Sequence, residues 1–314
     1  PVLLPPWLKP GAKVALVAPS RAVAPEEVHE WIAWMQNRGY RVLPGRHLHD
    51  RFHQWSGTDE LRARDLQEAL DDPEIRAVFL ARGGHGATRL LDKIQTEALV
   101  RYPKWIIGYS DATALLNHLL QQTGLVTVHG PMPFQFSSQG VPPAASSEDW
   151  ELTLSLMEGT LHELSPLDLG QTVSPSVDYE TILTGRLIGG NLSVLYSLMG
   201  SHSMPCPEGA ILLVEDLDEY GYHLDRMWLA LRRSGYLNSL AAILVGDFTD
   251  IKDHAIPFGL KPLEILQEHA GGLPLQVAPG FPCGHGARNM PLPLGLPVEL
   301  STKAGVIQCL RLLW

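Results

Sequence analysis

Residues 104–131, KWIIGYSDATALLNHLLQQTGLVTVHGP, contain the pattern from which the fold class follows. The apolar residues of 104–110 predict a buried strand. Residues 111–124 have a helical apolar pattern that ends at a glycine, and 125–131 predict a second strand. A strand, a helix and another strand in this order indicate parallel strands joined by a helix.

The same alternation extends from this stretch toward the N-terminus. Strands are predicted over 13–20, 41–45 and 75–84, and helices over 26–40, 57–73 and 87–94. Thr58 is placed to cap the second of these helices. This alternation is typical of an α/β fold, and it predicts a parallel sheet with helices on both faces.

The composition changes after Pro131, where residues 133–147 are rich in serine, glycine and proline. We therefore predict an N-terminal domain over 1–160, a linker over 161–177 and a smaller C-terminal α/β domain over 178–314. The C-terminal part has its own alternation. It predicts strands over 209–217 and 240–248, and helices over 222–235 and 262–271.

The formal net charge of −10, without a dense run of lysine and arginine, excludes nucleic acid and anionic membranes as the main partner. Three scattered cysteines, Cys206, Cys283 and Cys309, suggest neither a disulfide framework nor a metal site, and they favour a reducing compartment. No apolar stretch approaches the length of a spanning helix, and the first residues do not resemble a signal peptide.

Ser110 lies at the turn between the strand of 104–110 and the helix that follows. Free N–H groups at a helix start suit a developing oxyanion, and a serine hydroxyl there could attack a carbonyl if a base took its proton. Serine is also a favoured helix cap, so the turn alone leaves both interpretations open.

A glycine-rich loop, LARGGHGATRLL at 80–91, also joins a strand to a helix. It matches neither a phosphate-binding P-loop nor a dinucleotide fingerprint, so no nucleotide cofactor is expected. The glycines could point backbone N–H groups at a ligand, with Gly84 as a donor to an oxyanion. A tight turn that requires positive φ is the alternative.

Two further stretches contain residue types that are used in acid–base chemistry. Glu215 and Asp216 end a very apolar strand, where α/β proteins present functional side chains, and a carboxylate there could orient an imidazole. His285 lies between two glycines in FPCGHGARN, and histidine is suited to proton transfer near neutral pH. A solvated acidic loop and an ordinary loop histidine are the alternatives.

Taken together and in this order, these pieces resemble the LD-carboxypeptidase family, which includes murein tetrapeptide carboxypeptidases and microcin C immunity peptidases. The matching segments cover nearly the whole chain: VALVAPS, GTDELRARDL, RGGHGATRLL, IIGYSDATALL, HGPM, GGNLSVL, LLVEDLDE, VGDF and GHGARN. One departure is His85, where many members have tyrosine, and it affects the wall of the pocket.

The resemblance implies that Ser110 is the nucleophile, His285 the general base and acid, and Glu215 the group that orients His285. The N–H groups of Gly84 and Asp111 would form the oxyanion hole. Neither metal nor cofactor is expected. The implied substrate is a murein tetrapeptide in cell-wall recycling, from which a cytoplasmic enzyme, often a homodimer in this family, removes the terminal D-alanine.

An exopeptidase must also hold the free carboxylate of its substrate, and arginine is the natural donor. Arg82, beside the glycine loop, and Arg288, near His285, are the two candidates. Two other functions stay open. One is an immunity-type peptidase that cleaves a toxic peptidyl-nucleotide, and the other is a two-domain binding protein without catalysis.

Overall fold

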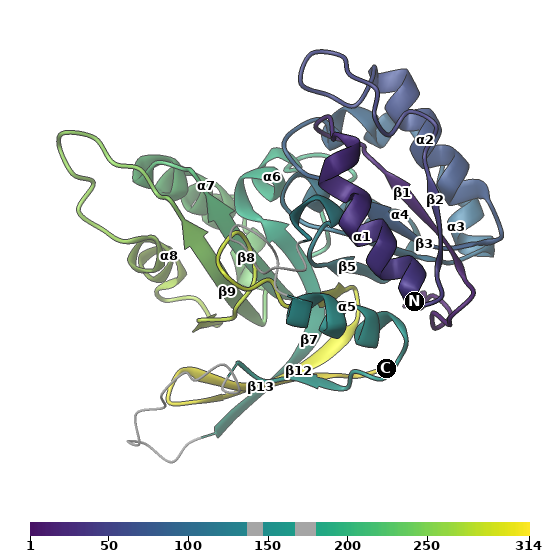
Figure 1. The fold of residues 1–314 in the computed structure, drawn as a ribbon. Coiled ribbons are helices and arrows are strands. Elements are labelled where there is room, and N and C mark those ends of the chain that lie inside the picture. The colour runs from purple at the N-terminus through teal and green to yellow at the C-terminus, as the bar shows by residue number, and fades with distance from the viewer. Residues whose placement is uncertain (137–146, 167–179) are drawn as a thin grey trace.

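The computed structural model describes residues 1–136, 147–166 and 180–314, which build two β-sheets with helices packed around them (Figure 1). The first sheet has the strand order β11-β5-β4-β3-β1-β2. Its strands are β1 (Lys13–Val17), β2 (Arg41–Pro44), β3 (Ile75–Leu80), β4 (Trp105–Gly108), β5 (Thr127–His129) and β11 (Leu292–Leu294). Its helices are α1 (Pro25–Asn37), α2 (Asp59–Asp71), α3 (Glu97–Arg101), α4 (Thr113–Thr123) and α5 (Ser147–Met157), with 3₁₀ turns η1 (Ala87–Lys93), η2 (Ser110–Ala112) and η3 (Pro133–Gln135).

Strands β1 to β5 are parallel, and helices cover both faces of the sheet, as the sequence predicts. On one face, Trp31 of α1 packs against Phe79 of β3 and Trp150 of α5, at ring-centroid distances of 4.8 and 5.7 Å. Helices α2, α3 and α4 follow one another along the other face. The central strands β3 and β4 are almost entirely apolar, with Arg76 as the one charged residue, because both sides of the sheet are buried there. Thr58 caps α2, since its hydroxyl accepts from the Leu61 N–H.

The strand β11 is a feature that the alternation pattern does not predict. It comes from the C-terminal part of the chain, pairs antiparallel with β5 and closes that edge of the first sheet. Leu292 and Leu294 are fully buried there. The first sheet is therefore mainly parallel, with one antiparallel edge strand.

The second sheet has the order β10-β9-β8-β7-β12-β13-β6. Strands β7 to β10 are parallel, whereas β12, β13 and β6 extend the sheet in antiparallel fashion from β7. The strands are β6 (Glu163–Leu164), β7 (Glu180–Asn191), β8 (Ile211–Leu217), β9 (Ala242–Thr249), β10 (Gln276–Pro279), β12 (Pro297–Lys303) and β13 (Val306–Leu312). The helices are α6 (Leu192–Ser197), α7 (Gly221–Arg233) and α8 (Pro262–Ala270), with the 3₁₀ turn η5 (Tyr236–Ser239).

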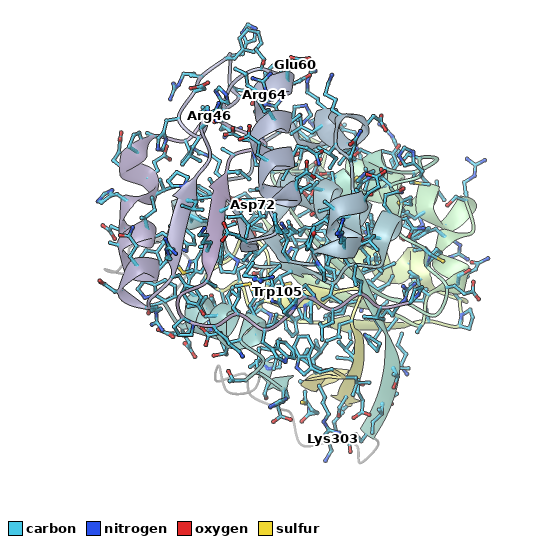
Figure 2. All side chains as sticks on the ribbon, turned by 90° about the vertical axis from the view of Figure 1, so that its right-hand side faces the viewer. Arg46, Glu60, Arg64, Asp72, Trp105 and Lys303 are labelled. Atoms are coloured by element: carbon cyan, nitrogen blue, oxygen red, sulfur yellow. The ribbon has the colours of Figure 1, made fainter. Side chains whose placement is uncertain are left out.

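The predicted domain limits at 160 and 178 stay predictions. Of the expected linker, residues 167–177 lie outside the described residues, whereas Glu163 and Leu164 form β6 and pair with β13. Trp105 of β4 is fully buried, and Figure 2 shows Lys303 at the tip of the β12–β13 hairpin. Among the described residues, no helix is both long and apolar enough to cross a membrane.

Helix α4 and strand β7 connect the two sheets. The side chain of Asn117 in α4 exchanges two hydrogen bonds with the backbone of Gly189, and Thr113 Oγ1 accepts from the Asn191 N–H at 2.9 Å. Gly190 has φ of +137°, and a Cβ there would lie 2.7 Å from Thr113 Oγ1. Glycine therefore allows the close approach that fixes β7 against the helix that follows Ser110.

Candidate active site

Ser110 stands directly after β4, at the first position of η2, with φ of +61°. Few residues other than glycine adopt this left-handed region, and the strain costs about 1–3 kcal/mol. Its hydroxyl oxygen lies 3.1 Å from Nε2 of His285. The strained turn thus presents the serine to a histidine that is distant in sequence.

His285 lies between Ser110 and Glu215. Its Nδ1 is 2.7 Å from Oε2 of Glu215, which is fully buried in β8. An ionised carboxylate only accepts hydrogen bonds, so Nδ1 carries the proton of the neutral imidazole and Nε2 accepts from the Ser110 hydroxyl. Gly284 lets the loop come this close, because a Cβ there, at φ of +113°, would lie 2.9 Å from Glu215.

The loop that carries His285 crosses from β10 of the second sheet to β11 of the first. The Asp247 N–H donates to Cys283 O at 2.8 Å, and the Gly284 N–H donates to the side-chain oxygen of Asn289 at 3.0 Å. The Asn289 N–H in turn donates to buried Asp149 of α5 at 2.9 Å. The position of the imidazole therefore depends on contacts with both sheets.

The pKa of His285 reflects opposing effects. Burial alone lowers it, but the hydrogen bond and charge of Glu215, together with the charges of Asp216 and Asp247, raise it above its ordinary value. Burial and the nearby charge of Glu215 also raise the pKa of Asp216 to about 7 and that of Asp247 to about 6. The negative charge at Glu215 thus influences every titratable group around it.

Asn191 joins β7 to the two acids at the end of β8. Its Nδ2 donates to Asp216 at 3.1 Å and lies 3.4 Å from Glu215, while its Oδ1 accepts from the Val194 N–H and caps α6. Asp216 also accepts from the Ser193 N–H at 2.9 Å. The segment GGNLSVL belongs to the resemblance, but nothing in the sequence pattern indicates that Asn191 contacts the acids.

The glycine-rich loop lies against Ser110. A Cβ on Gly83 would be 3.4 Å from Ser110 Oγ, and Gly84 lines the same cavity with φ of +108°. The first hydrogen bond within η2 is donated by the Ala112 N–H to Tyr109 O, so the Asp111 N–H precedes the intrahelical bonds. Gly84 and Asp111 both line the cavity together with Ser110.

The side chain of Asp111 is buried and holds two loops. Its carboxylate accepts from the Ser20 hydroxyl at 2.6 Å and from the Ala87 N–H at 2.9 Å. Ser20 follows β1, and Ala87 ends the glycine-rich loop. Asp111 therefore connects the loop after β1 and the glycine-rich loop to the turn that contains Ser110.

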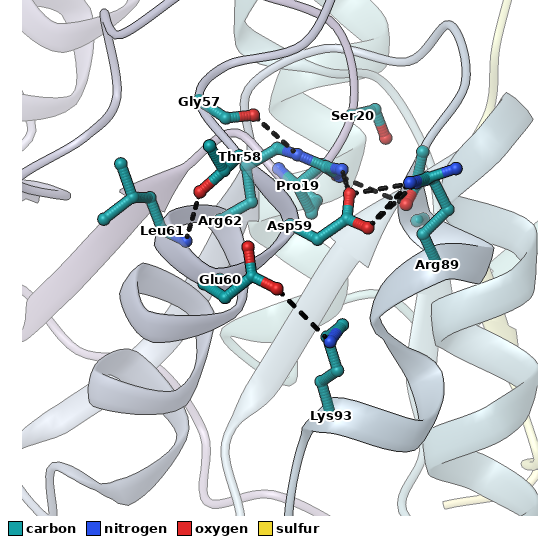
Figure 3. A network of polar contacts seen from close by, with 12 residues as sticks. Pro19, Ser20, Gly57, Thr58, Asp59, Glu60, Leu61, Arg62, Arg89 and Lys93 are labelled. Atoms are coloured by element: carbon teal, nitrogen blue, oxygen red, sulfur yellow. Dashed lines mark hydrogen bonds and ion pairs between the residues drawn. The ribbon is translucent and has the colours of Figure 1, made fainter. Parts of the chain in front are cut away.

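Buried Arg62 of α2 also contacts both of these loops, and Figure 3 shows its polar contacts. Its guanidinium donates to the carbonyl oxygens of Pro19, Gly57 and Gly86 and pairs with Asp59, which also binds Arg89. The sequence pattern GTDELRARDL contains this arginine without revealing its partners. Its contacts fix the glycine-rich loop to the end of β1.

A cavity of about 490 Å³ opens in front of these groups. Ser110, Asp111, Gly84 and His285 line it, whereas Glu215 lies behind His285 and away from the cavity. The remaining walls combine aromatic and apolar side chains with acidic ones, and they include Tyr109, Met132, Phe134, Asn191, Asp216, Asp218 and Glu219.

The two arginines that the sequence suggested for carboxylate binding are placed differently. Arg82 lines the cavity, pairs with Glu27 at 3.0 Å and lies over the ring of Phe134. Arg288 instead pairs with buried Asp149 at 2.7 Å and is not among the residues that line the cavity. A third arginine, Arg21, lines the cavity and carried no sequence signal.

Two histidines near the site are not part of the cavity lining. His85, the departure from the family pattern, is exposed, with its ring centroid 6.5 Å from that of Trp55. His129 is fully buried, and neither of its ring nitrogens has a hydrogen-bond partner among the described residues. Burial lowers the pKa of His129 to about 4, so its ring is neutral at physiological pH.

Residues 1–136, 147–166 and 180–314 contain no group of three or more His, Cys, Asp or Glu arranged to hold a metal ion.

Comparison with known proteins gives a consistent result. Residues 14–130 match a family model described as the LD-carboxypeptidase N-terminal domain, and residues 184–300 match the LD-carboxypeptidase C-terminal domain. The murein tetrapeptide carboxypeptidase of Pseudomonas aeruginosa is 31% identical, with 98% of this chain and 97% of that protein covered.

Two further similarities widen the range of substrates to consider. The microcin C7 self-immunity protein of Escherichia coli is 28% identical, with 90% of this chain and 88% of that protein covered. The crystal structure of a muramoyltetrapeptide carboxypeptidase from Oxalobacter formigenes has a TM-score of 0.81 at 30% identity, with 96% of this chain and 98% of that chain covered.

Proposed function

Because this chain belongs to the LD-carboxypeptidase family, whose members are serine peptidases, we propose that it removes the terminal D-alanine from murein tetrapeptides. The peptide would be L-Ala-γ-D-Glu-meso-diaminopimelate-D-Ala. The observation that carries the proposal is the chain of contacts from Ser110 through His285 to Glu215, at 3.1 and 2.7 Å. This arrangement suits acyl transfer by a Ser-His-Glu triad.

In the proposed reaction, His285 Nε2 takes the proton of the Ser110 hydroxyl as its oxygen attacks the carbonyl carbon before D-alanine. The N–H groups of Gly84 and Asp111 hold the oxyanion, each lowering the barrier by about 2.7–4 kcal/mol. Protonated His285 then gives its proton to the leaving amine, and water hydrolyses the acyl-enzyme with His285 again as base. These steps use neither a metal nor a cofactor.

The proposed setting is cytoplasmic cell-wall recycling by a homodimer. Three free cysteines and a net charge of −10 are compatible with a reducing compartment and a small peptide substrate. Nucleic acid and membrane are not part of the proposal. Cell fractionation and sedimentation of the purified protein measure the location and the oligomeric state.

A second candidate is an immunity-type peptidase that cleaves a peptidyl-nucleotide. It is supported by the similarity to the self-immunity protein and by the rings of Tyr109 and Phe134 in the cavity wall, since such a substrate needs an aromatic surface for its base. A binding protein without catalysis is the least supported function, because its serine would need neither the positive φ nor the contact with His285.

The test is mass spectrometry of the purified protein incubated with murein tri-, tetra- and pentapeptides and with an aminoacyl-sulfamoyl adenylate. We expect release of D-alanine from the tetrapeptide, and a loss of roughly 10⁴-fold or more in Ser110→Ala. Ser197→Ala, an exposed serine on α6, is the matched control and should keep full activity. Full activity in Ser110→Ala would overturn the mechanism, and cleavage of the adenylate alone would favour the second candidate.

A further inference from the structure

The acidic side chains of the cavity wall disfavour the binding of an anionic substrate. Asp216, Asp218 and Glu219 line one wall, and the charge of buried Glu215 lies close behind His285. A peptide that ends in a free carboxylate enters against these negative charges, so its binding requires a cation at the right place. The arginines that line the cavity are Arg21 and Arg82.

The three arginines near the site differ in their partners. Arg288 is paired with Asp149 at 2.7 Å and with Glu148 at 3.4 Å. Arg82 donates to the Glu27 carboxylate at 3.0 Å and to Ala22 O at 3.2 Å. In the described part of the chain, Arg21 has neither an ion pair nor a side-chain hydrogen bond, and its side chain is exposed at the cavity. Of these three arginines, Arg21 is therefore the one that no carboxylate among the described residues pairs with.

Arg21 is also held next to the reacting groups. Its backbone N–H donates to Gly83 O at 3.2 Å. A Cβ built on Gly84 would lie 2.8 Å from Arg21 Cβ and 2.9 Å from its Nε, so the arginine side chain lies along the glycine-rich loop. The same loop touches Ser110 through Gly83. The guanidinium therefore flanks the loop whose N–H group would hold the oxyanion.

We propose that Arg21 forms the subsite for the terminal carboxylate of the peptide, an inference that rests on the proposed function. In a substrate that loses a single residue, this carboxylate is attached to the α-carbon next to the scissile nitrogen and must lie beside the oxyanion site. Guanidinium binds carboxylate through two parallel hydrogen bonds, which a lysine ammonium cannot reproduce. Arg21 thus selects peptides that have a free C-terminal carboxylate on the residue directly after the cleaved bond.

The first measurement compares two substrates and two arginine variants. The tetrapeptide with a free D-alanine carboxylate and its D-alaninamide counterpart are supplied to the natural protein, Arg21→Gln and Arg21→Lys. We expect Arg21→Gln to lower kcat/KM for the free acid by about 10- to 100-fold and to change kcat/KM for the amide by less than about 3-fold. Arg21→Lys should recover only part of the loss. Arg46→Gln, which alters an exposed arginine that does not line the cavity, is the matched control.

The second measurement separates this inference from the proposed function. Calorimetric titration of Ser110→Ala and of Ser110→Ala/Arg21→Gln with both peptides measures binding without hydrolysis. Weaker binding of the free acid, with unchanged binding of the amide, supports the subsite even if the natural protein releases no D-alanine. Equal effects of Arg21→Gln on acid and amide overturn the subsite. The subsite at Arg21 is also overturned if Arg82→Gln removes the preference for the acid and Arg21→Gln does not, whichever peptide is hydrolysed.

Discussion

Glu215 is a fully buried carboxylate in contact with His285 and close to Asp216 and Asp247. Its charge helps raise the pKa of all three groups. Because a general base must be unprotonated, a raised pKa of His285 places the acid limb of the pH–rate profile above the ordinary histidine value. Removal of the charge should move that limb toward lower pH.

Glu215→Gln tests this dependence. The amide keeps the size of the side chain but removes the charge that favours protonated His285. We expect the acid limb of kcat/KM to move down by about one to three pH units and kcat to fall roughly 10³- to 10⁴-fold. The measurement is a pH series of D-alanine release, with Glu208→Gln on the exposed surface as control. An acid limb that stays in place would contradict the coupling.

At the scale of single residues, the sequence indicated where Ser110, Glu215 and His285 lie because each follows a recognisable strand or glycine pattern. The structure brings these three side chains together, and their catalytic roles stay a proposal. The sequence could not indicate Arg21. What distinguishes Arg21 is that its side chain has no partner among the described residues, and only the three-dimensional structure reveals this. The sequence likewise could not show that Arg288 pairs with Asp149 and does not line the cavity.

At the scale of elements, the contact between α4 and β7 sets the distance between the serine turn and the buried acids. Asn191 takes part on both sides, since its N–H donates to Thr113 and its amide donates to Asp216. The contact requires Gly190, whose φ of +137° and missing Cβ leave room for Thr113. Enlarging this residue should separate the two elements.

Gly190→Ala should lower the free energy of unfolding by about 1–3 kcal/mol, through strain at positive φ and the clash with Thr113. Activity should fall as well, because β7 carries Asn191. The matched control is Gly200→Ala, at φ of +78° with no atom within 4 Å of the added carbon, which has the backbone strain alone. Urea unfolding and D-alanine release are measured on both, and equal losses would show that the close approach does not matter.

The elements of the first sheet could be predicted because its strands are short and mainly apolar, and β1 to β4 are each followed by a helical segment. The three-residue β11 escaped prediction because its pairing with β5 is long-range and its sequence, Leu-Pro-Leu, has no alternation. The antiparallel pairing in the second sheet escaped prediction for a similar reason. Its strands β12 and β13 pair with β7 and β6, which are far away in the chain, as Figure 1 shows for β7.

At the scale of the whole molecule, the two halves of the chain are joined by contacts between segments that are far apart in the sequence. β11 belongs to the first sheet but lies in the chain between β10 and β12 of the second sheet. In addition, Trp7, close to the N-terminus, packs against Trp314 at 4.8 Å between ring centroids. Trp7 also stacks on Trp105 of β4. These contacts couple the stability of both halves.

We therefore expect a single cooperative transition in differential scanning calorimetry, with calorimetric and van't Hoff enthalpies that agree. Leu292→Ala, which removes fully buried side-chain atoms from β11, should destabilise the protein by about 2–5 kcal/mol and shift the whole transition. Leu313→Ala, at a partly exposed position, should shift it much less. Two resolved transitions, of which Leu292→Ala moves only one, would show that the halves unfold independently.

The crossing of the His285 loop from one sheet to the other has a consequence for biosynthesis. Ser110 and His285 are separated by 175 residues, so translation delivers the hydroxyl long before the imidazole. A nascent chain on the ribosome holds a serine that has no base, and such a serine is inert toward amides. Under the proposed mechanism, hydrolytic competence arises only once residues 285–294 have emerged and docked, which protects the cell from stray cleavage by unfinished chains.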